Sequence, residues 1–545
     1  MSSYSESKLI RSSKKSRDPM ETISAWMDDN KSVASLRSMM EDPMLVFALE
    51  GGQPVGWKKY DQAQYKIEVD ENQNDKAKEI KLCSFARPHM RSFHCAWFAL
   101  FAAYLMWFSI SPLLSEIRDD LQITNKDIWT SSIASLQGTL FMRFMLGPLC
   151  DKFGARVLFA LVLALASIAT ACTGLIHTTR DLIILRLTIG MAGSCVVMCQ
   201  YWVSSMFTRE VIGTVSGLCS GWGNLGGGVA QVLMGSVIFP AFKEIFQGDS
   251  EKAWRFACIV PASFGFFTSI VIYYIADDCP KGNYSELKKH KSMGDVSVTA
   301  NMCAGATNSN AWFLFIQYAC SFGVELTMNN AASLYFRDEF GLSLEAAAAI
   351  ASVCGSMSLF ARGLGGYVSD QAMKTMGMRG RLLIQMTFLM LEGGLVLVFS
   401  KAHSLTESII VMICFSIFVQ AAEGSTFAIV PYVDPKNGGV ITGIVGAGGS
   451  TGAIGFGLTF RQLGYGDSFF IMGCAIMGTS LFSTLINIKK HSSIFWGKEV
   501  NKKSRRKKLG KSKQQTLPAT VMGSGSRTDE PSIMTEPSRI TMQTW

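Results

Sequence analysis

The chain has 545 residues, of which 48% are hydrophobic and 17% charged, and its formal net charge is +9. A water-soluble protein of this length divides into domains that carry charge throughout. Here the charge lies near the two ends and in short breaks between long apolar runs, which excludes an ordinary soluble protein. The net positive charge comes largely from the C-terminal tail, where an anionic membrane leaflet explains it better than nucleic acid, so no nucleic-acid partner is expected.

Residues 1–92 form a polar N-terminal segment with scattered Ser, Asp, Glu and Lys, and we expect it to be cytoplasmic and partly disordered. It lacks an apolar run near residue 10 of the kind that a cleaved signal peptide needs. The first spanning helix is therefore expected to direct membrane insertion.

Twelve apolar stretches follow, each suited to a membrane-spanning helix. They are expected near residues 93–115, 128–149, 157–177, 181–204, 211–238, 254–276, 311–334, 344–367, 382–400, 406–431, 438–460 and 468–488. The predicted fold class is an all-α membrane protein with a six-helix half at 93–276 and another at 311–488. Residues 277–310 are expected to form a cytoplasmic linker, and 489–545 a basic cytoplasmic tail.

Basic residues flank the predicted bundle on both sides. Five of them precede the first span, at Lys76, Lys78, Lys81, Arg87 and Arg91, and the tail contains the run NKKSRRKKLGKSK. Cytoplasmic flanks of spanning helices carry an excess of Lys and Arg. Both termini are therefore predicted to be cytoplasmic, which an even number of spans allows.

Two sequence patterns of the first predicted half recur in the second. The pattern R-x-x-x-G-x-x-x-D begins at Arg143 and recurs 219 positions later at Arg362. The pattern SGL with GNLG, from Ser216, recurs 226 positions later as TGI with GSTG, from Thr442. Similar offsets predict duplicated halves that face one another across a substrate path.

Arg143 and Arg362 are the first candidate binding residues. Each lies deep in an apolar stretch, where a charge costs at least about 2.5–3.5 kcal/mol and is kept for a partner or a cavity. An anion between the two would relieve their repulsion, and the planar fork of Arg suits a flat oxyanion. The alternative is that each pairs with an acid, Asp151 for Arg143 and Glu325 or Glu423 for Arg362.

Glycine is concentrated in the fifth and eleventh predicted spans. Each glycine costs a helix about 1 kcal/mol relative to Ala, so its retention points to close helix packing or to backbone that approaches a ligand. The candidates are Gly223, Gly226, Gly448 and Gly449, and Asn224 adds a donor and an acceptor within the first run. No strand precedes these glycines, so a nucleotide-binding loop is not expected.

The fourteen cysteines lie mostly in apolar stretches, without a CxxC pair or a His at ligand spacing. We therefore expect no metal site and no cofactor. No nucleophile–base pair stands out either, so the chain is not expected to be an enzyme.

Several motifs carry a family resemblance over about residues 93–488. GPLCDKFGAR (147–156) and the R-x-x-x-G of Arg186 and Gly190 resemble elements of the major facilitator superfamily. CQYWVSSMF (199–207), GLCSGWGNLGGG (217–228), YACSFGVEL (318–326), LFARGLGGYVSD (359–370), GMRGRL (377–382), AEGSTFAIVPYV (422–433) and TGIVGAGG (442–449) resemble the nitrate/nitrite porter family, above all the high-affinity nitrate transporters of plants and algae.

The resemblance implies a major facilitator fold and roles for particular residues. Arg143 and Arg362 would clamp nitrate, with nitrite as a second substrate, and Asn224 and the glycine-rich helices would line the path. Tyr318 and Phe322 would flank the anion, although ordinary packing explains them equally well. Asp151, Arg156 and, with less support, Asp370 would lock one conformational state. Ser450 departs from the Asn that is common in this family, which puts its contact in doubt.

Nitrate import into a negative cell interior costs about 2.3 kcal/mol per 100 mV, so a co-transported cation is expected, with a proton as first choice. The candidate coupling residues are Glu325, Glu392 and Glu423. Glu325 is preferred, unless it only neutralises an arginine. The sequence thus predicts a plasma-membrane nitrate symporter that works by alternating access, and many plant relatives need a small single-pass accessory subunit. The alternatives are a nitrate/nitrite exchanger and a nitrate sensor.

Overall fold

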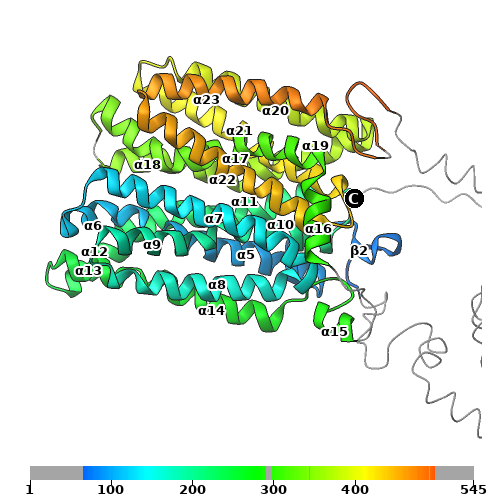
Figure 1. Ribbon diagram of the computed structural model, residues 1–545, viewed down its shortest axis with the longest axis horizontal. Coiled ribbons are helices and arrows are strands. Elements are labelled where there is room, and N and C mark those ends of the chain that lie inside the picture. The colour runs from blue at the N-terminus through cyan, green and yellow to red at the C-terminus, as the bar shows by residue number, and fades with distance from the viewer. Residues whose placement is uncertain (1–64, 290–296, 343, 490, 498–545) are drawn as a thin grey trace, which may run out of the picture. The chain divides into compact units, whose positions relative to one another are not determined.

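The computed structural model describes residues 65–289, 297–342, 344–489 and 491–497, and these fold into a bundle of long helices (Figure 1). The helices of the first part are α5 (His89–Phe108), α6 (Leu114–Leu121), α7 (Asn125–Phe153), α8 (Ala155–Ala171), α9 (Thr179–Ile189), α10 (Cys195–Met206), α11 (Ile212–Val232), α12 (Phe239–Ile245), α13 (Ser250–Ala257) and α14 (Ile259–Ile275). Short turns of tighter or wider helix, η3 (Ser111–Leu113), η4 (Cys172–Leu175), η5 (Gly190–Ser194) and η6 (Leu233–Ile238), extend several of them.

The second part repeats this plan. Its helices are α15 (Tyr284–Lys289), α16 (Val298–Ala306), α17 (Ser309–Phe340), α18 (Leu344–Ser356), α19 (Ala361–Met376), α20 (Met378–Phe399), α21 (Leu405–Val433), α22 (Gly438–Gln462) and α23 (Tyr465–Ser480), with η7 (Met357–Leu359) and η8 (Leu481–Thr484). Each predicted span overlaps a helix of the bundle. Within the described ranges, nine helical segments are long and apolar enough to cross a membrane, so the number twelve stays a prediction.

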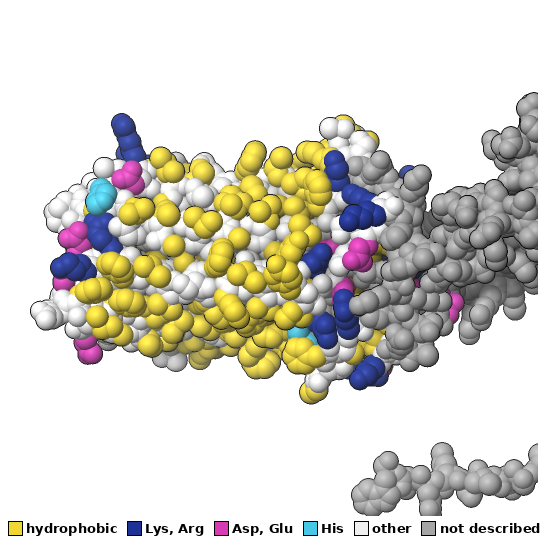
Figure 2. Space-filling model, turned by 90° about the horizontal axis from the view of Figure 1, so that it is seen from below, with side chains coloured by type: hydrophobic (Ala, Val, Ile, Leu, Met, Phe, Trp, Pro, Cys, Tyr) yellow, Lys and Arg dark blue, Asp and Glu magenta, His cyan; other side chains and the backbone are white. Residues whose placement is uncertain are grey.

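The surface of the bundle suits lipid. Charged side chains gather at the two ends, and a broad hydrophobic band covers the middle (Figure 2). Large apolar side chains of the helices are exposed, for example Phe141 (65%), Ile184 (64%) and Phe267 (66%). A soluble monomer rarely exposes so large an apolar surface, so the chain is a multi-pass membrane protein.

A small antiparallel hairpin marks one end of the bundle, which we call the hairpin end, and we call the other the far end. Its strands are β1 (Val69–Asp70) and β2 (Lys76–Ala77). The amide of Thr208 donates to the Ala77 carbonyl (2.9 Å) and Lys76 Nζ donates to the Ser204 carbonyl (2.6 Å). Burial lowers the pKa of Lys76 to about 8. Residues 65–88 of the polar N-terminal segment are therefore folded onto the bundle, whereas the predicted disorder of residues 1–64 lies outside the described residues.

The described residues of the predicted linker, 277–289 and 297–310, include two short helices. These are α15 and α16, and the Ser297 hydroxyl accepts a hydrogen bond from the Ala300 amide (3.4 Å) at the start of α16. Gly305 of α16 packs so closely on α22 that a Cβ there would lie 2.3 Å from Val440. The polar composition of this segment did not predict these short helices, because packing on the bundle stabilises them.

The two R-x-x-x-G-x-x-x-D motifs make equivalent helix crossings. Gly147 of α7 lies against α22, where an added Cβ would be 2.5 Å from the Gly439 carbonyl oxygen. Gly366 of α19 lies against α11, where a Cβ would be 1.9 Å from the Gly213 carbonyl oxygen. Only glycine allows such close backbone approach, so the repeat in sequence becomes a repeat in packing.

The aspartates of the same motifs cap the helices that the glycines cross. Asp151 accepts hydrogen bonds from the amides of Gly439 (3.0 Å) and Val440 (3.3 Å), at the N-terminus of α22. Asp370 accepts from the amides of Gly213 (3.0 Å) and Thr214 (2.7 Å), at the N-terminus of α11. The first amides of a helix lack partners within it, and they carry partial positive charge. Both carboxylates therefore tie the two parts of the chain together at the hairpin end.

We predict that Gly366→Ala lowers the free energy of unfolding by about 1–3 kcal/mol, because the added methyl group forces α19 and α11 apart. Gly457→Ala on α22 is the control, since a Cβ at Gly457 meets nothing within 4 Å. Thermal unfolding of the purified protein in detergent measures the effect. Equal melting temperatures for the two variants would contradict the tight crossing.

Candidate functional site

The two buried arginines meet at one aromatic ring in the middle of the bundle. Arg143 comes from α7 and Arg362 from α19, and both are almost completely buried. Their guanidinium carbons lie over the ring of Phe322, on α17, at 5.0 and 6.0 Å from its centroid. The predicted convergence of the two side chains is therefore a feature of the structure, whereas their contact with a substrate remains a prediction.

Arg362 is neutralised by acids. Its Nη2 lies 2.7 Å from a carboxylate oxygen of Glu325 and also forms an ion pair with Glu423. Its Nε donates to the side-chain oxygen of Gln420 (2.9 Å). The alternative interpretation of the sequence, pairing with Glu325 or Glu423, thus describes Arg362 correctly with both acids at once. Gln420 was missed, although it lies three residues before Glu423, on the same face of α21.

Arg143 has a different environment. Its Nη1 donates to the Gly446 carbonyl of α22 (2.6 Å), and its Nη2 donates to the Gly193 carbonyl of η5 (2.8 Å). Among the described residues no carboxylate lies within ion-pair distance of it. The suggested partner, Asp151, instead caps α22 at the hairpin end, so that pairing was wrong. Among the described residues, the hydrogen-bond partners of the Arg143 guanidinium are two backbone carbonyls, and it lies over an aromatic ring.

Asn224 connects the glycine-rich helix α11 to this charge cluster. Its Nδ2 donates to both carboxylate oxygens of Glu325, at 3.0 and 3.1 Å. Its Oδ1 has no hydrogen-bond partner within the described part of the chain. Asn224 therefore holds Glu325 against Arg362 and keeps one acceptor unused.

Aromatic packing surrounds Phe322. The ring of Tyr318 stacks on it at 5.2 Å and 9°, and Phe427 meets Tyr318 edge-on at 5.1 Å. Gly449 makes room for Phe322, because a Cβ at this glycine would lie 2.3 Å from the ring. The two rings thus pack as a stacked pair, and both arginines lie over the Phe322 ring of that pair.

The other predicted path glycines are packing residues in this structure. A Cβ at Gly448 would lie 2.1 Å from the Phe315 carbonyl oxygen, and one at Gly226 would lie 2.2 Å from that of Phe101. A Cβ at Gly223 would meet Leu100 at 2.5 Å. Ser450 is buried, and its hydroxyl has no hydrogen-bond partner among the residues that the structure describes.

The loop residues predicted to lock one state divide into two groups. Asp151 and Asp370 bridge the two parts of the chain by capping α22 and α11, and Asp370 also pairs with Arg381 (2.7 Å). Arg156, in contrast, pairs with Asp278 (3.6 Å), just after α14, so its ion pair joins the first half to the start of the predicted linker and does not reach the second half. Burial raises the pKa of Asp278, and the adjacent Arg156 opposes that shift.

A third membrane acid, Glu392 on α20, is fully buried, and neither carboxylate oxygen has a hydrogen-bond partner in the described ranges. A group of three or more His, Cys, Asp or Glu side chains suited to a metal ion was not found among the described residues. The chemistry of this site is therefore that of buried arginines, carboxylic acids and amides.

Comparisons with known proteins agree with this architecture. Residues 96–458 match the family model of the Major Facilitator Superfamily. The bundle is similar in fold to a solved proton:xylose symporter, XylE (TM-score 0.54, 12% identity, 72% of this chain and 95% of that one). It is also similar to the human organic anion transporter MFSD10 (TM-score 0.50, 14% identity, 72% of this chain and 99% of that one).

Three relatives illustrate the sequence matches. "High-affinity nitrate transporter 2.3" of Oryza sativa subsp. japonica is 38% identical over 412 residues, 75% of this chain and 78% of that protein. "Nitrate transporter 2.1" of Chlamydomonas reinhardtii is 34% identical, over 72% of each chain. "Nitrate/nitrite transporter NrtP" of Nostoc punctiforme is 26% identical, over 68% of this chain and 86% of that protein.

The unequal compensation of the two arginines predicts opposite effects on stability. Arg362→Met leaves Glu325 and Glu423 buried without their cation, and we expect a loss of about 3–5 kcal/mol in unfolding free energy. Arg143→Met removes no ion pair and so leaves no carboxylate without its direct partner. The melting temperature should therefore stay near that of the wild type or rise. Thermal unfolding without added anions tests this pair, and equal destabilisation by both substitutions would contradict the asymmetry.

Proposed function

The chain belongs to the major facilitator superfamily and, within it, to the nitrate/nitrite porter family, and from that premise we propose that it carries nitrate across a membrane together with a cation. It is a transporter, not an enzyme. Nitrite is proposed as a second substrate, because relatives named for nitrate alone and for nitrate and nitrite both match this chain.

The observation that carries this proposal is the buried cation of Arg143, which forms no ion pair with a carboxylate among the described residues. Nitrate is flat and carries one negative charge, so its oxygens can accept two parallel N–H bonds from a guanidinium fork. It would replace the Gly446 and Gly193 carbonyls as acceptors, with the face of Phe322 beside it. Arg362 would form the other side of the clamp, and Asn224 and Tyr318 would line it.

The acids around Arg362 suggest how cation coupling could arise. With Glu325 and Glu423 ionised, these two acids and the two arginines carry no net charge. A bound nitrate adds one negative charge in a place that water does not solvate, and a proton on a glutamate would restore the balance. We therefore propose H⁺ symport, with Glu325 or Glu423 as the proton site. Glu392, whose carboxylate oxygens have no hydrogen-bond partner in the described ranges, is a further candidate acid.

Alternating access follows from the repeated halves. We propose that residues 93–276 and 311–488 rock against one another, with 277–310 as their connection. The Asp151 and Asp370 caps would hold the hairpin end closed, and Arg156 would support that state from within its own half. The hairpin end would face the cytoplasm, with both termini inside and 489–545 as a basic tail, at the plasma membrane. A small single-pass accessory subunit belongs to the same proposal.

One observation favours a second candidate, a nitrate/nitrite exchanger. Glu325 is held by Arg362 and by Asn224 at the same time, which is the arrangement expected of an acid that only neutralises a cation. An exchanger needs no titrating acid, since the counter-moving anion balances the charge.

We predict that Arg143→Lys and Arg362→Lys each reduce labelled nitrate uptake into proteoliposomes by about tenfold or more, because Lys keeps the charge but loses the bidentate fork. Arg180→Lys is the control, since Arg180 is an exposed residue of α9. Near-normal uptake by either central variant would remove that arginine from the clamp.

Symport and exchange differ in a second measurement. If a glutamate carries the proton, Glu325→Gln or Glu423→Gln should abolish the stimulation of uptake by an imposed inward proton gradient, while Glu407→Gln, at an exposed position of α21, should not. Uptake that ignores the gradient in the wild type but requires internal nitrite would support the exchanger instead.

A further inference from the structure

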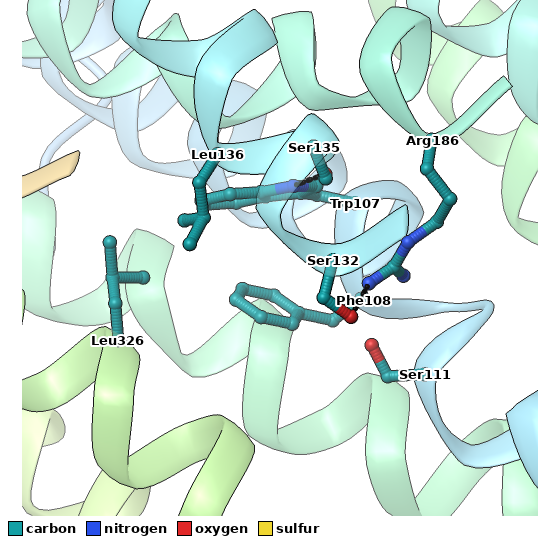
Figure 3. A pocket seen from close by; sticks show the side chains of 8 residues that line it. All are labelled: Trp107, Phe108, Ser111, Ser132, Ser135, Leu136, Arg186 and Leu326. Atoms are coloured by element: carbon teal, nitrogen blue, oxygen red, sulfur yellow. Dashed lines mark hydrogen bonds between the residues drawn. The ribbon is translucent and has the colours of Figure 1, made fainter. Parts of the chain in front are cut away.

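A small cavity with polar side chains in its lining lies beside the N-terminal half of α7 (Figure 3). It is small, with a volume of about 10 Å³, which is room for about one water molecule, and it opens toward solvent on one side. Its lining residues come from α5, η3, α7 and α9 and, from the second part of the chain, α17: Trp107, Phe108, Ser111, Ser132, Ser135, Leu136, Arg186 and Leu326. Three serines and one arginine thus face a cavity within an otherwise apolar wall.

Arg186 is the charged residue of this cavity. It is 4% exposed, and its Nη2 donates to the Ser132 hydroxyl at 3.0 Å. Its Nε has no hydrogen-bond partner in the described ranges. The acid closest in sequence, Asp181, accepts from the amides of His177 (3.2 Å) and Thr178 (2.9 Å) at the start of α9. Among the described residues no carboxylate forms an ion pair with Arg186.

Arg186 differs in this respect from most of the other buried arginines in the described part of the chain. The described part of the chain buries five arginines, and three of them, Arg156, Arg362 and Arg381, form ion pairs with acids. The two that do not are Arg143 and Arg186. A buried charge costs several kcal/mol unless it is paired, so an arginine kept unpaired beside a cavity points to a ligand of opposite charge.

The serines add hydrogen-bond donors to the cation. Ser132 accepts from Arg186, and Ser135 accepts from the indole of Trp107 (2.8 Å), so the hydroxyl hydrogen of each can turn toward an anion. The Ser111 hydroxyl lies beside that of Ser132 on the same side of the cavity (Figure 3). A guanidinium with adjacent hydroxyls suits a small inorganic anion, and the apolar remainder of the lining would exclude larger polar molecules.

One face of α7 connects this cavity to Arg143. Ser132, Ser135, Thr139 and Arg143 follow one another at intervals of three to four residues, over about 16 Å at 1.5 Å per residue. Thr139 donates to the Gly190 carbonyl (2.6 Å), and Arg143 donates to that of Gly193, so η5 lies along the same face.

Trp107 stands between the cavity and this route. It lines the cavity, and its ring also packs on η5, where a Cβ at Gly193 would lie 2.7 Å from the indole.

We propose that Arg186, Ser132 and Ser111 form a second anion site, which holds a small inorganic anion on the far side of Trp107 before it reaches Arg143. The proposal rests on the proposed function only for the identity of the cargo as nitrate. The anion would pass between two uncompensated cations on one helix face, and movement of the Trp107 indole would open the way.

Anion binding is measured with the full-length protein in detergent, in the background of Arg143→Gln, which removes the central cation. Sodium nitrate and sodium chloride, matched in ionic strength with sodium gluconate, should still raise the melting temperature of this variant. Adding Arg186→Gln should abolish the rise, and adding Arg180→Gln should not, because Arg180 lies on the same helix but is exposed. A rise that survives Arg186→Gln, or no rise in the Arg143→Gln background, would overturn the proposal.

Should Arg186→Gln fail to fold, Ser132→Ala in the same background keeps the test open, with an expected loss of about three- to tenfold in apparent anion affinity from one missing donor. An unchanged affinity in that variant would also overturn the site.

Uptake kinetics distinguish this inference from the proposed function. With Arg143 intact, Arg186→Gln should raise the KM for nitrate about five- to twentyfold and change kcat by less than about twofold, because loading suffers and the central clamp does not. An anion-dependent rise in melting temperature without nitrate uptake in the wild type would refute the cargo and leave the second site standing. Uptake with an unchanged KM in Arg186→Gln would refute the second site and leave the carrier standing.

Discussion

The unequal compensation of two buried arginines is the constraint on which the centre of this molecule depends. Lipid and apolar side chains cannot solvate a guanidinium, so each arginine must find negative charge or dipoles within the protein. Arg362 has two carboxylates and the Gln420 amide, while Arg143 has two backbone carbonyls. Arg362 is therefore part of a cluster of ion pairs, whereas Arg143 is the cation whose electrostatic energy an added anion would lower most. In the proposed nitrate site, binding specificity would therefore originate at Arg143, and Arg362 would supply the charge balance around it.

The asymmetry arises within a symmetric frame. The duplicated glycine crossings and aspartate caps give α7 and α19 equivalent positions, which brings their arginines to the same ring of Phe322. The two halves then differ in what surrounds each arginine, because the acids Glu325 and Glu423 both lie on helices of the second part. A duplicated framework with unequal side chains can hold one cation permanently neutral and leave the other for a ligand.

Much of the fold could be predicted from the sequence, since apolar runs of spanning length determine where the helices lie, and the recurrence of R-x-x-x-G-x-x-x-D identifies the paired arginines. The partners of those residues could not be predicted. Asp151 lies two helical turns from Arg143 and was a natural candidate to pair with it, yet it reaches the N-terminus of a helix almost three hundred positions away. The ordered hairpin and α16 escaped detection for the same reason, because contacts with distant helices stabilise them. For Arg186 the sequence revealed the R-x-x-x-G motif. It could not reveal that no carboxylate among the described residues pairs with Arg186, because that depends on three-dimensional packing.

The caps also indicate how binding energy can drive a conformational change. A hydrogen bond to a charged group contributes about 1.5–3 kcal/mol, so in the proposed mechanism the amides held by Asp151 and Asp370 would keep the hairpin end closed by a modest free energy. A ligand that binds the open and closed states with affinities differing by about 10⁴-fold supplies about 5.5 kcal/mol, which is of comparable size. An anion that draws Arg143 toward Arg362 acts on α7 and α19, and these are the helices that carry the two capping aspartates. The same two helices thus carry the arginines proposed to bind the anion and the aspartate contacts that, in the proposed mechanism, break before the hairpin end opens.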